Sequence, residues 1–267
     1  MADLLTRIAE QPRDVLEAIA NSMDVRASEP AMRSICARYL GRLAAPNAEV
    51  LEVGCGNGAA TRLILRHVRP ARLVGIDVSP VFVAMAGEAL AGEAGVSFAL
   101  GDAAATRQPA SSFDLVVAHT VYTHLVDPRA ALAEAHRVLK PGGRLAIFDA
   151  DFASLSVALF DGDPLQSAAA IVLRHMVHGP HIMRQLPRLV AAAGFVVESV
   201  EPHAYVQTTS PDYLLTLFSR AMGAAGRAGE IGQAMVESFD AEARRRVADQ
   251  TFFGSLTFLS VTARKGR

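Results

Sequence analysis

Residues 50–61 are VLEVGCGNGAAT, in which three glycines at alternate positions follow an apolar segment. The apolar segment predicts a strand, and the residues after the glycines predict a helix. Because glycine has no side chain, a strand-to-helix turn of this kind lets the backbone approach a ligand closely. Gly54, Gly56 and Ala59 also satisfy the dinucleotide fingerprint. The stretch therefore predicts an α/β fold with a bound ligand and leaves the class of ligand open.

From residue 48 onward, short apolar runs alternate with helix-like stretches, as in a parallel sheet flanked by helices. Ser79-Pro80 and Asp127-Pro128 each place an N-cap residue before a proline, so both predict helix starts. The second of these helices is expected to end at Pro141-Gly142-Gly143, and a helix over 183–193 at Gly194. The predicted strands are 50–53, 73–76, 96–100, 114–118, 144–148, 195–200 and 256–261.

The chain has 267 residues, of which 51% are hydrophobic, and this predicts one domain over 1–267 with a single large core. Ligands of open α/β sheets bind at the carboxyl ends of the strands. We therefore expect the segments outside the alternation to cover the ligand, although plain surface packing is the alternative. The expected parts are an N-terminal helical cover at 1–46, a ligand-binding half at 47–150, insertions at 151–182 and 204–253, and the remaining core at 183–203 and 254–264.

Charge and composition disfavour several classes of partner. The 26 basic residues nearly balance the 27 acidic ones, so there is no charge excess to hold nucleic acid or an anionic membrane. Cys36 and Cys55 lie far apart and predict no disulfide framework, as in a reducing compartment. No stretch approaches the roughly 20 apolar residues of a membrane span, and the first 20 residues carry charges throughout. We expect a cytoplasmic protein.

An acidic residue accompanies each of the first three predicted strands. Glu52 would repel a pyrophosphate beside the glycines but would attract a ligand that carries sulfonium and ammonium groups, unless it is an ordinary exposed residue. Asp77 lies roughly 20 residues further on, where a carboxylate can accept hydrogen bonds from both hydroxyls of a ribose. Asp102 and the backbone of Ala103 can bind the edge of an adenine. Together the acids favour a cationic adenosine derivative.

These motifs resemble the class I S-adenosylmethionine-dependent methyltransferases, and in particular their ubiquinone/menaquinone-biosynthesis-type branch of small-molecule enzymes. The resemblance covers about residues 48–150 and rests on LEVGCGNG, GIDVSP, LGDA, FDLVVAH followed by VYTHLVDP, and RVLKPGGRLAIFD. It implies an α/β, Rossmann-like sheet of seven mostly parallel strands with helices on both faces and helical cap segments. The antiparallel last strand, 256–261, would lie between the fifth and sixth strands.

The resemblance also implies the residues that bind S-adenosylmethionine. Glu52 and the glycines would contact the methionine part, Asp77 the ribose, and Asp102 and Ala103 the adenine. His119 would close on the methionine side. The full implied set is Glu52, Gly54, Cys55, Gly56, Asp77, Val78, Asp102, Ala103 and His119. Arg33, in the N-terminal cover, is a further candidate for binding the cofactor carboxylate, although an exposed charge is the ordinary alternative.

Methyl transfer is an in-line displacement, so the protein has to align the nucleophile with the methyl group and the sulfur and to exclude water. The acceptor atom, oxygen, nitrogen or carbon, cannot be deduced from the sequence. A helping base is expected after the fourth strand, where His124 is the candidate catalytic base and Tyr122 a candidate substrate contact. Hydrogen-bonded spacers are the alternative for both residues.

Two other functions stay open at this stage. The chain could bind S-adenosylmethionine without transferring methyl, as a sensor or a cyclase, because fold does not settle chemistry. An NAD(P)-dependent oxidoreductase is less favoured, because Glu52 opposes a pyrophosphate and because neither Lys140 nor Lys265 forms a Tyr-x-x-x-Lys pair.

A small-molecule acceptor needs a mostly apolar pocket, which the cover segments are expected to line. The candidates, for which core packing is the alternative, are Asp151, Phe152, Phe160, His178, Met183, Tyr205 and Phe218. His175, His178 and His181 are spaced by three residues, but Gly179-Pro180 interrupts the helix and no further ligand pattern accompanies them. We therefore predict a pocket or packing role for them and no metal site. The apolar helical cover could also form a homodimer surface.

Overall fold

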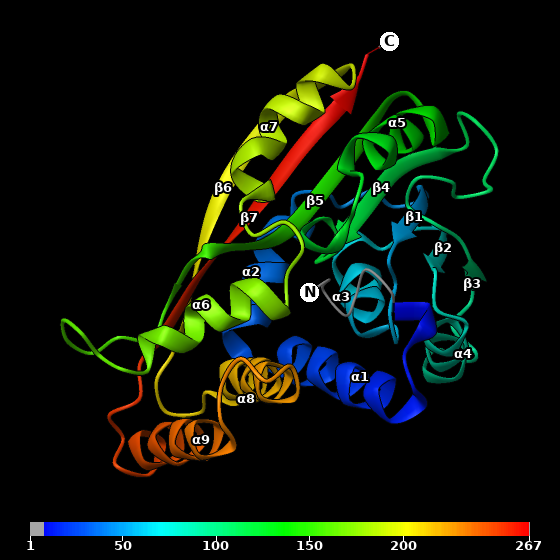
Figure 1. Ribbon diagram of the computed structural model, residues 1–267. Coiled ribbons are helices and arrows are strands. Elements are labelled where there is room, and N and C mark those ends of the chain that lie inside the picture. The colour runs from blue at the N-terminus through cyan, green and yellow to red at the C-terminus, as the bar shows by residue number, and fades with distance from the viewer. Residues whose placement is uncertain (1–7, 267) are drawn as a thin grey trace.

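The computed structural model describes residues 8–266, which form a twisted sheet with helices on both sides (Figure 1). Seven strands lie in the order β3-β2-β1-β4-β5-β7-β6. Neighbouring strands are parallel except at β7, which runs antiparallel to both β5 and β6. The predicted topology is thus confirmed, including the place of the last strand. The strands are β1 (Glu49–Val53), β2 (Arg72–Asp77), β3 (Val96–Leu100), β4 (Phe113–His119), β5 (Leu139–Ser156), β6 (Phe195–Gln207) and β7 (Gly254–Lys265).

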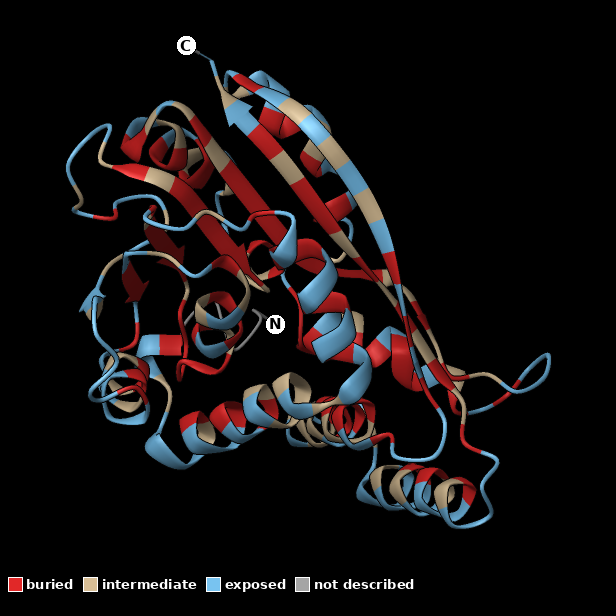
Figure 2. Cartoon of the chain, turned by 180° about the vertical axis from the view of Figure 1, so that it is seen from behind, coloured by how far each residue is buried: buried red, intermediate tan, exposed pale blue. Residues whose placement is uncertain are grey.

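Alternate residues of each central strand face opposite sides of the sheet and enter two separate cores. Val50 packs in the core that includes α2 and α3, whereas its neighbour Leu51 packs in the core that includes α5 and α7. Figure 2 shows the central strands almost wholly buried, as expected of a parallel sheet covered on both faces. The helices are α1 (Arg13–Ser28), α2 (Pro30–Gly41), α3 (Ala59–Val68), α4 (Pro80–Ala89), α5 (Pro128–Val138), α6 (Gln166–His175), α7 (Ile182–Ala192), α8 (Asp212–Arg227) and α9 (Gln233–Ala248), with a short 3-10 helix η2 (Tyr122–His124).

The predicted helix starts are confirmed by their caps. The Ser79 side chain accepts a hydrogen bond from the backbone of Phe82 at the start of α4. Asp127 accepts from the backbone N–H groups of Arg129 and Ala130 at the start of α5. Each cap is followed by a proline at the first helical position, where the missing N–H breaks no helical hydrogen bond. Both helices thus begin at the residues predicted from the cap and the proline.

Strands β5 and β6 are longer than expected. Residues 151–156 continue β5 and residues 204–207 continue β6, so the predicted starts of both insertions lie inside the sheet. The reason is the third strand between them, because Thr257 of β7 pairs with Asp151 of β5 and with Ala204 of β6. The cover segments therefore begin farther from the centre of the sheet than the sequence indicated.

Helix α1 of the N-terminal cover and helices α6, α8 and α9 of the two insertions lie below the carboxyl ends of the parallel strands in Figure 1. Helix α1 packs against α3, α4 and α8, and α6 packs against α8. Arg246 of α9 binds both carboxylate oxygens of Asp163, at 2.7 and 2.9 Å, and so joins the two insertions through a buried ion pair. None of the described helices has both the length and the apolar character needed to cross a membrane.

Candidate functional site

The glycine turn after β1 is tightly constrained by its surroundings. Gly54 and Gly56 have φ angles of 70° and 53°, which side-chain-bearing residues rarely adopt. A Cβ on Gly54 would lie 2.5 Å from Cγ2 of Val121, and one on Gly56 would lie 2.8 Å from Sδ of Met23. The turn is also pinned to the neighbouring strand, because the N–H groups of Gly54 and Cys55 donate to the carbonyl of Ile76. Only glycine fits at these two positions.

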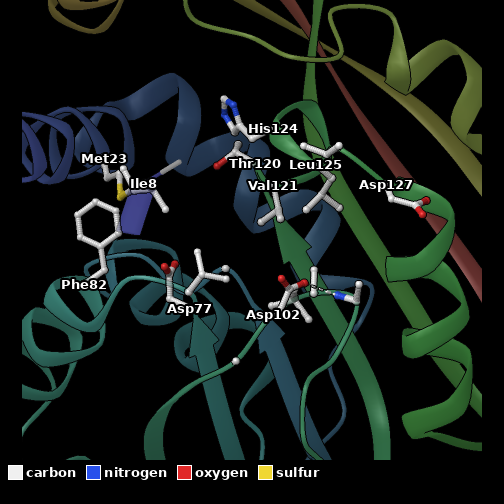
Figure 3. Close-up of a pocket in the computed structure, with 17 residues that line it drawn as sticks. Ile8, Met23, Asp77, Phe82, Asp102, Thr120, Val121, His124, Leu125 and Asp127 are labelled. Atoms are coloured by element: carbon white, nitrogen blue, oxygen red, sulfur yellow. Dashed lines mark hydrogen bonds between the residues drawn. The ribbon is translucent and has the colours of Figure 1, made fainter. Parts of the chain in front are cut away.

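A cavity of about 340 Å³, here called the large cavity, opens at the carboxyl ends of β1, β2 and β4 (Figure 3). Asp77 and Asp102 lie on one side of it and His124 on the other. The side chains of Val78 and Phe82 supply apolar surface. Several expected cofactor residues are therefore brought to one place from different parts of the chain: Gly54, Asp77, Val78, Asp102 and Ala103.

Asp77 and Asp102, two of the aspartates that line the large cavity, are held by backbone N–H groups. Asp77 accepts from the N–H of Gly56 through Oδ2 and from the N–H of Ser79 through Oδ1, each at 2.9 Å. Burial raises the pKa of the Asp77 carboxyl, and these hydrogen bonds partly offset the rise. Asp102 accepts from the N–H of Ala104 at 2.7 Å through Oδ1. Both carboxylates are thus oriented before any ligand binds.

Glu52 is fully buried and does not line the large cavity or either of the two smaller cavities next to it. Its Oε2 accepts from the hydroxyl of Thr61 at 2.6 Å, and its Oε1 has no hydrogen-bond partner among residues 8–266. Burial raises the pKa of Glu52 to about 8, and the charge of Asp77 adds to the rise while Thr61 opposes it. With a pKa of about 8, the Glu52 carboxyl is mostly protonated at pH 7 in the ligand-free protein, and it forms no part of the wall of the large cavity.

A smaller cavity of about 40 Å³, the methionine-side cavity, adjoins the glycine turn. It is lined by Gly54, Cys55, Gly56, His119 and Arg26, among others. The imidazole of His119 is buried against the ring of Phe148 and beside Tyr39, and this burial lowers the pKa of His119 to about 3. His119 is consequently neutral, whereas Arg26 brings a positive charge to this cavity.

Arg33, the expected ligand of the cofactor carboxylate, is exposed on α2 and lines none of these cavities. The prediction was wrong because the inner face of α2 is formed by Met32, Ile35, Cys36, Tyr39 and Leu40, which turns Arg33 to solvent. Arg26 of α1, and not Arg33, lines the cavity beside the glycine turn. Its Nη2 donates to Oγ1 of Thr120 at 2.8 Å, and its guanidinium lies over the ring of Tyr213. Ile19, Met23 and Arg26 are spaced by four and three residues, which places them on one face of α1. This spacing could have indicated that Arg26 faces inward.

A third cavity of about 60 Å³, here called the inner cavity, lies between α1, α8 and interior residues of β5 and β7. It shares Met23, Thr120 and His124 with the large cavity, so the two adjoin. Its remaining wall is mostly apolar but contains four polar or charged side chains. The apolar residues are Ile19, Ala150, Phe152, Met176, Leu217 and Phe258 together with the ring of Tyr213, and the others are Ser22, Arg26, Asp149 and Arg220.

Asp149 is held rigidly in this wall. It accepts from the N–H and the hydroxyl of Thr123 at 3.0 and 3.1 Å and from the N–H of Ala150 at 2.8 Å. Burial raises the pKa of Asp149, and the charge of His124 partly offsets that rise. An imidazole and a fixed carboxylate therefore face the same small cavity. Asp149 directly follows the fifth predicted strand, 144–148, and no motif in the sequence singled it out.

His124 and Tyr122 separate on the short helix η2. His124 lines both the large and the inner cavity, as expected of a group near the reacting atoms. Tyr122 is buried in the core with α5 and α7 and lines neither cavity, so its expected contact with substrate is wrong. In a 3-10 helix successive residues are about 120° apart. Residues two apart cannot face the same side, and here the tyrosine faces the core.

Of the seven expected pocket residues, only Phe152 lines the inner cavity. Asp151 instead forms an ion pair with Arg184. Met183 belongs to the core with α5 and α7, whereas Tyr205 and Phe218 belong to the core with α2 and α3. The remaining two, Phe160 and His178, are exposed. Met183, Tyr205 and Phe218 thus take the alternative of core packing.

The three spaced histidines are separated by the structure. His175 is buried at the end of α6, where its Nε2 lies 3.0 Å from Oε2 of Glu230. The backbone N–H of His178 donates to the carbonyl of Thr123 at 3.1 Å, and His181 precedes α7. Within residues 8–266 no group of three or more histidine, cysteine or acidic side chains could hold a metal ion.

Residues 51–147, from β1 into β5, match the methyltransferase domain family. These residues form a class I S-adenosylmethionine-dependent methyltransferase domain. Its strand order, its glycine turn and the acids after β1, β2 and β3 are those that the resemblance implied. S-adenosylmethionine is the cofactor of this family. The narrower resemblance to the ubiquinone/menaquinone-type branch stays a prediction.

Two relatives extend the similarity beyond the matched domain. An uncharacterized 37.1 kDa protein in transposon TN4556 of Streptomyces fradiae is 35% identical over 67% of this chain and 53% of its own length. An uncharacterized methyltransferase of Schizosaccharomyces pombe is 31% identical over 63% of this chain and 64% of its own length. The alignments thus span between half and two thirds of these relatives.

Among solved structures, that of the [4+2]-cyclase SpnF aligns over 99% of this chain and 98% of its own, with a TM-score of 0.61 and 20% identity. Identity this low shows a shared fold and does not transfer a reaction.

Proposed function

We propose that this methyltransferase transfers a methyl group from S-adenosylmethionine to a small-molecule acceptor that binds in the inner cavity. The observation that supports it is the shared wall of Met23, Thr120 and His124, which joins the large cavity to the inner cavity. In-line transfer needs donor and acceptor on one axis and out of water. Two adjoining cavities of unequal size, one at the glycine turn and one among apolar helices, meet that need.

In this proposal the adenosyl part occupies the large cavity. Asp77 accepts hydrogen bonds from the ribose hydroxyls, while Asp102 and the N–H of Ala103 bind the adenine edge. The methionine part lies in the methionine-side cavity, where Arg26 pairs with its carboxylate. The buried carboxyl of Glu52 ionises more readily beside a cation, so it favours a ligand with sulfonium and ammonium groups over a pyrophosphate. When bound, this cofactor supplies the electrophilic methyl group.

The chain's own part in the chemistry falls to His124 and Asp149. For a hydroxyl or protonated amine acceptor, His124 takes the proton that the nucleophile loses, and the carboxylate of Asp149 favours the resulting imidazolium. Thr123 and Ala150 hold Asp149 in place. The apolar wall excludes water, so little competes with the acceptor. For a carbon acceptor His124 would remove the proton after transfer.

Calorimetry on ligand-free protein tests the cofactor half of the proposal. S-adenosylhomocysteine is expected to bind, whereas NADH is expected to give no heat. Binding of NADH in its place would overturn the assignment and favour the oxidoreductase. The transfer half is tested by incubating the protein with S-adenosylmethionine labelled in the methyl group and an acceptor panel. Labelled product with equimolar S-adenosylhomocysteine supports transfer, and acceptor conversion without S-adenosylhomocysteine supports a cyclase-type reaction.

The expected homodimer and the cytoplasmic location are not tested by any of these observations and stay predictions. The same holds for the acceptor atom, which the wall of the inner cavity does not select.

A further inference from the structure

We propose that Met23 of α1 lies against the sulfur of the bound cofactor and favours S-adenosylmethionine, whose sulfur is cationic, over S-adenosylhomocysteine, whose sulfur is neutral. This inference rests on the proposed function, because it uses the places assigned there to the adenosyl, methionine and acceptor parts. It goes further by naming a residue that distinguishes the substrate form of the cofactor from its product form. The argument comes from the region where the three cavities meet.

Met23 and Thr120 each line the large cavity, the methionine-side cavity and the inner cavity. The sulfur of S-adenosylmethionine carries three substituents, which are the adenosyl group, the methionine chain and the methyl group. In the proposed function the first occupies the large cavity, the second occupies the methionine-side cavity, and the third points to the acceptor in the inner cavity. Because the three substituents meet at the sulfur, this atom lies where the three cavities meet, beside Met23 and Thr120.

The side chain of Thr120 is fixed by contacts within the protein. Its Oγ1 accepts from Nη2 of Arg26 at 2.8 Å and donates to the carbonyl of His119 at 2.7 Å. Its backbone N–H donates to the carbonyl of Phe148 at 2.6 Å. The φ angle of Thr120 is 57°, which β-branched residues rarely adopt, so these contacts hold it in a strained conformation. Thr120 therefore shapes the junction with a hydroxyl that already makes two hydrogen bonds.

Met23 brings a thioether to the same junction. Its Sδ and Cε lie 2.8 and 3.2 Å from the position that a Cβ on Gly56 would take, so the end of the side chain lies against the glycine turn. Figure 3 shows it in the wall of the large cavity. A thioether sulfur is polarisable and carries lone pairs, so it interacts favourably with a cation. Against the neutral sulfur of S-adenosylhomocysteine it gains only dispersion energy.

The acidic side chains of the site lie less close to this junction. Each acidic residue that lines these cavities lines one of them only, as Asp77 does in the large cavity and Asp149 in the inner cavity. Glu52 lines none of the three. Met23 is therefore placed to contact the sulfur directly, whereas the carboxyl groups act on it across a greater distance.

The test compares the affinities for S-adenosylmethionine and S-adenosylhomocysteine by calorimetry in the absence of an acceptor. Met23→Leu removes the sulfur at nearly constant volume. It is expected to lower the affinity for S-adenosylmethionine relative to S-adenosylhomocysteine about fivefold, as the loss of a favourable contact with a polarisable sulfur does. Met23→Lys places a positive charge at the junction and should lower this ratio further. Met32→Leu is the matched control and should keep the wild-type ratio, because Met32 is buried in the core with α2 and α3 and lines none of the three cavities.

The outcomes separate this inference from the proposed function. If neither ligand binds the wild-type protein, the proposed function fails. If both bind and Met23→Leu keeps the wild-type ratio, with or without an equal loss of affinity for both ligands, only the role of Met23 is overturned. Binding of S-adenosylhomocysteine by Met23→Leu shows that the variant is folded. Should that variant not fold, Met23→Lys decides, because an unchanged ratio there would place the sulfur away from residue 23.

Discussion

The phenol oxygen Oη of Tyr39 lies 2.5 Å from Nδ1 of His119, across the boundary between α2 and the end of β4. Both side chains are buried, and the rings of Tyr39, Phe148 and Phe258 stack in a nearly parallel column. Burial keeps Tyr39 protonated and His119 neutral, since it raises the pKa of the first and lowers that of the second to about 3. The hydroxyl of Tyr39 can then donate to Nδ1, which leaves the proton of His119 on Nε2.

Tyr39→Phe is expected to weaken binding of S-adenosylhomocysteine and to lower stability by about 1 to 3 kcal/mol, because it leaves a buried Nδ1 unsatisfied. Nitrogen NMR of the wild-type protein should show Nδ1 of His119 unprotonated at pH 7. Tyr205→Phe is the control, since Tyr205 is equally buried but bonds to Glu29 and lines none of the three cavities. Equal loss of cofactor affinity in both variants would contradict a positioning role for Tyr39.

Glu52→Gln is expected to stabilise the ligand-free protein by an amount that grows with pH. The folded-state pKa of Glu52 is about 8 and its ordinary value is 4.5, so folding favours the protonated form. Wild-type stability is therefore highest below the ordinary value and falls by about 1.4 kcal/mol per pH unit as the pH rises toward 8. The amide has no proton to lose and avoids this decline.

Urea unfolding of both proteins at pH 4.5, 6 and 8 measures this difference in the free energy of unfolding. The two curves should converge at the lowest pH and diverge upward. Glu93→Gln, on an exposed turn, should follow the wild type throughout. A constant gap between Glu52→Gln and the wild type would show that the carboxyl group of Glu52 does not titrate as burial predicts.

His124→Gln is expected to reduce turnover by about 100-fold or more, the usual contribution of a positioned base. Asp149→Asn should lower turnover less and shift the pH profile of the remaining activity, because the amide no longer favours the imidazolium. His178→Gln, an exposed histidine, is the matched control and should behave like the wild type. Steady-state rates over a pH series provide the measurement. Undiminished turnover in His124→Gln would remove this residue from the mechanism.

Gly54→Ala is expected to abolish cofactor binding, because the new Cβ would lie 2.5 Å from Cγ2 of Val121 at the mouth of the large cavity. Gly92→Ala has a comparable backbone strain, with a φ angle of 94°, but its Cβ would meet open space. Each variant should lose about 1 to 2 kcal/mol of stability from the left-handed backbone. Calorimetry should show that only Gly92→Ala still binds S-adenosylhomocysteine. Normal binding by Gly54→Ala would contradict the assigned place of the ligand.

The fold could be predicted where its signals are local. The caps Ser79 and Asp127, the glycine turn and the acids Asp77 and Asp102 depend on a few neighbouring residues, and the structure agrees with each of them. The lengths of β5 and β6 could not be predicted in the same way. Their ends are set by pairing with β7, which is distant in sequence, so no local pattern contained the information.

Most residues that line the cofactor side of the candidate site could be predicted from the sequence, whereas most residues on the acceptor side could not. Arg33 and Arg26 belong to neighbouring helices of one cover, and only the packing of that cover decides which of them faces inward. Tyr122 and His124 differ by two residues, yet the turn of η2 sends one to the core and the other to the cavities. Arg220 comes from a helix whose docking against α1 and α6 no sequence pattern fixes.

The wall formed by Met23, Thr120 and His124 belongs to both the large cavity and the inner cavity. Any shift of these side chains on binding of the cofactor therefore changes the shape of the site for the acceptor, and the reverse also holds. Thermodynamic linkage then requires that the help or hindrance be mutual, so that cofactor raises acceptor affinity by the same factor as acceptor raises cofactor affinity. Occupancy of the large cavity by the cofactor therefore changes the affinity of the inner cavity for the acceptor.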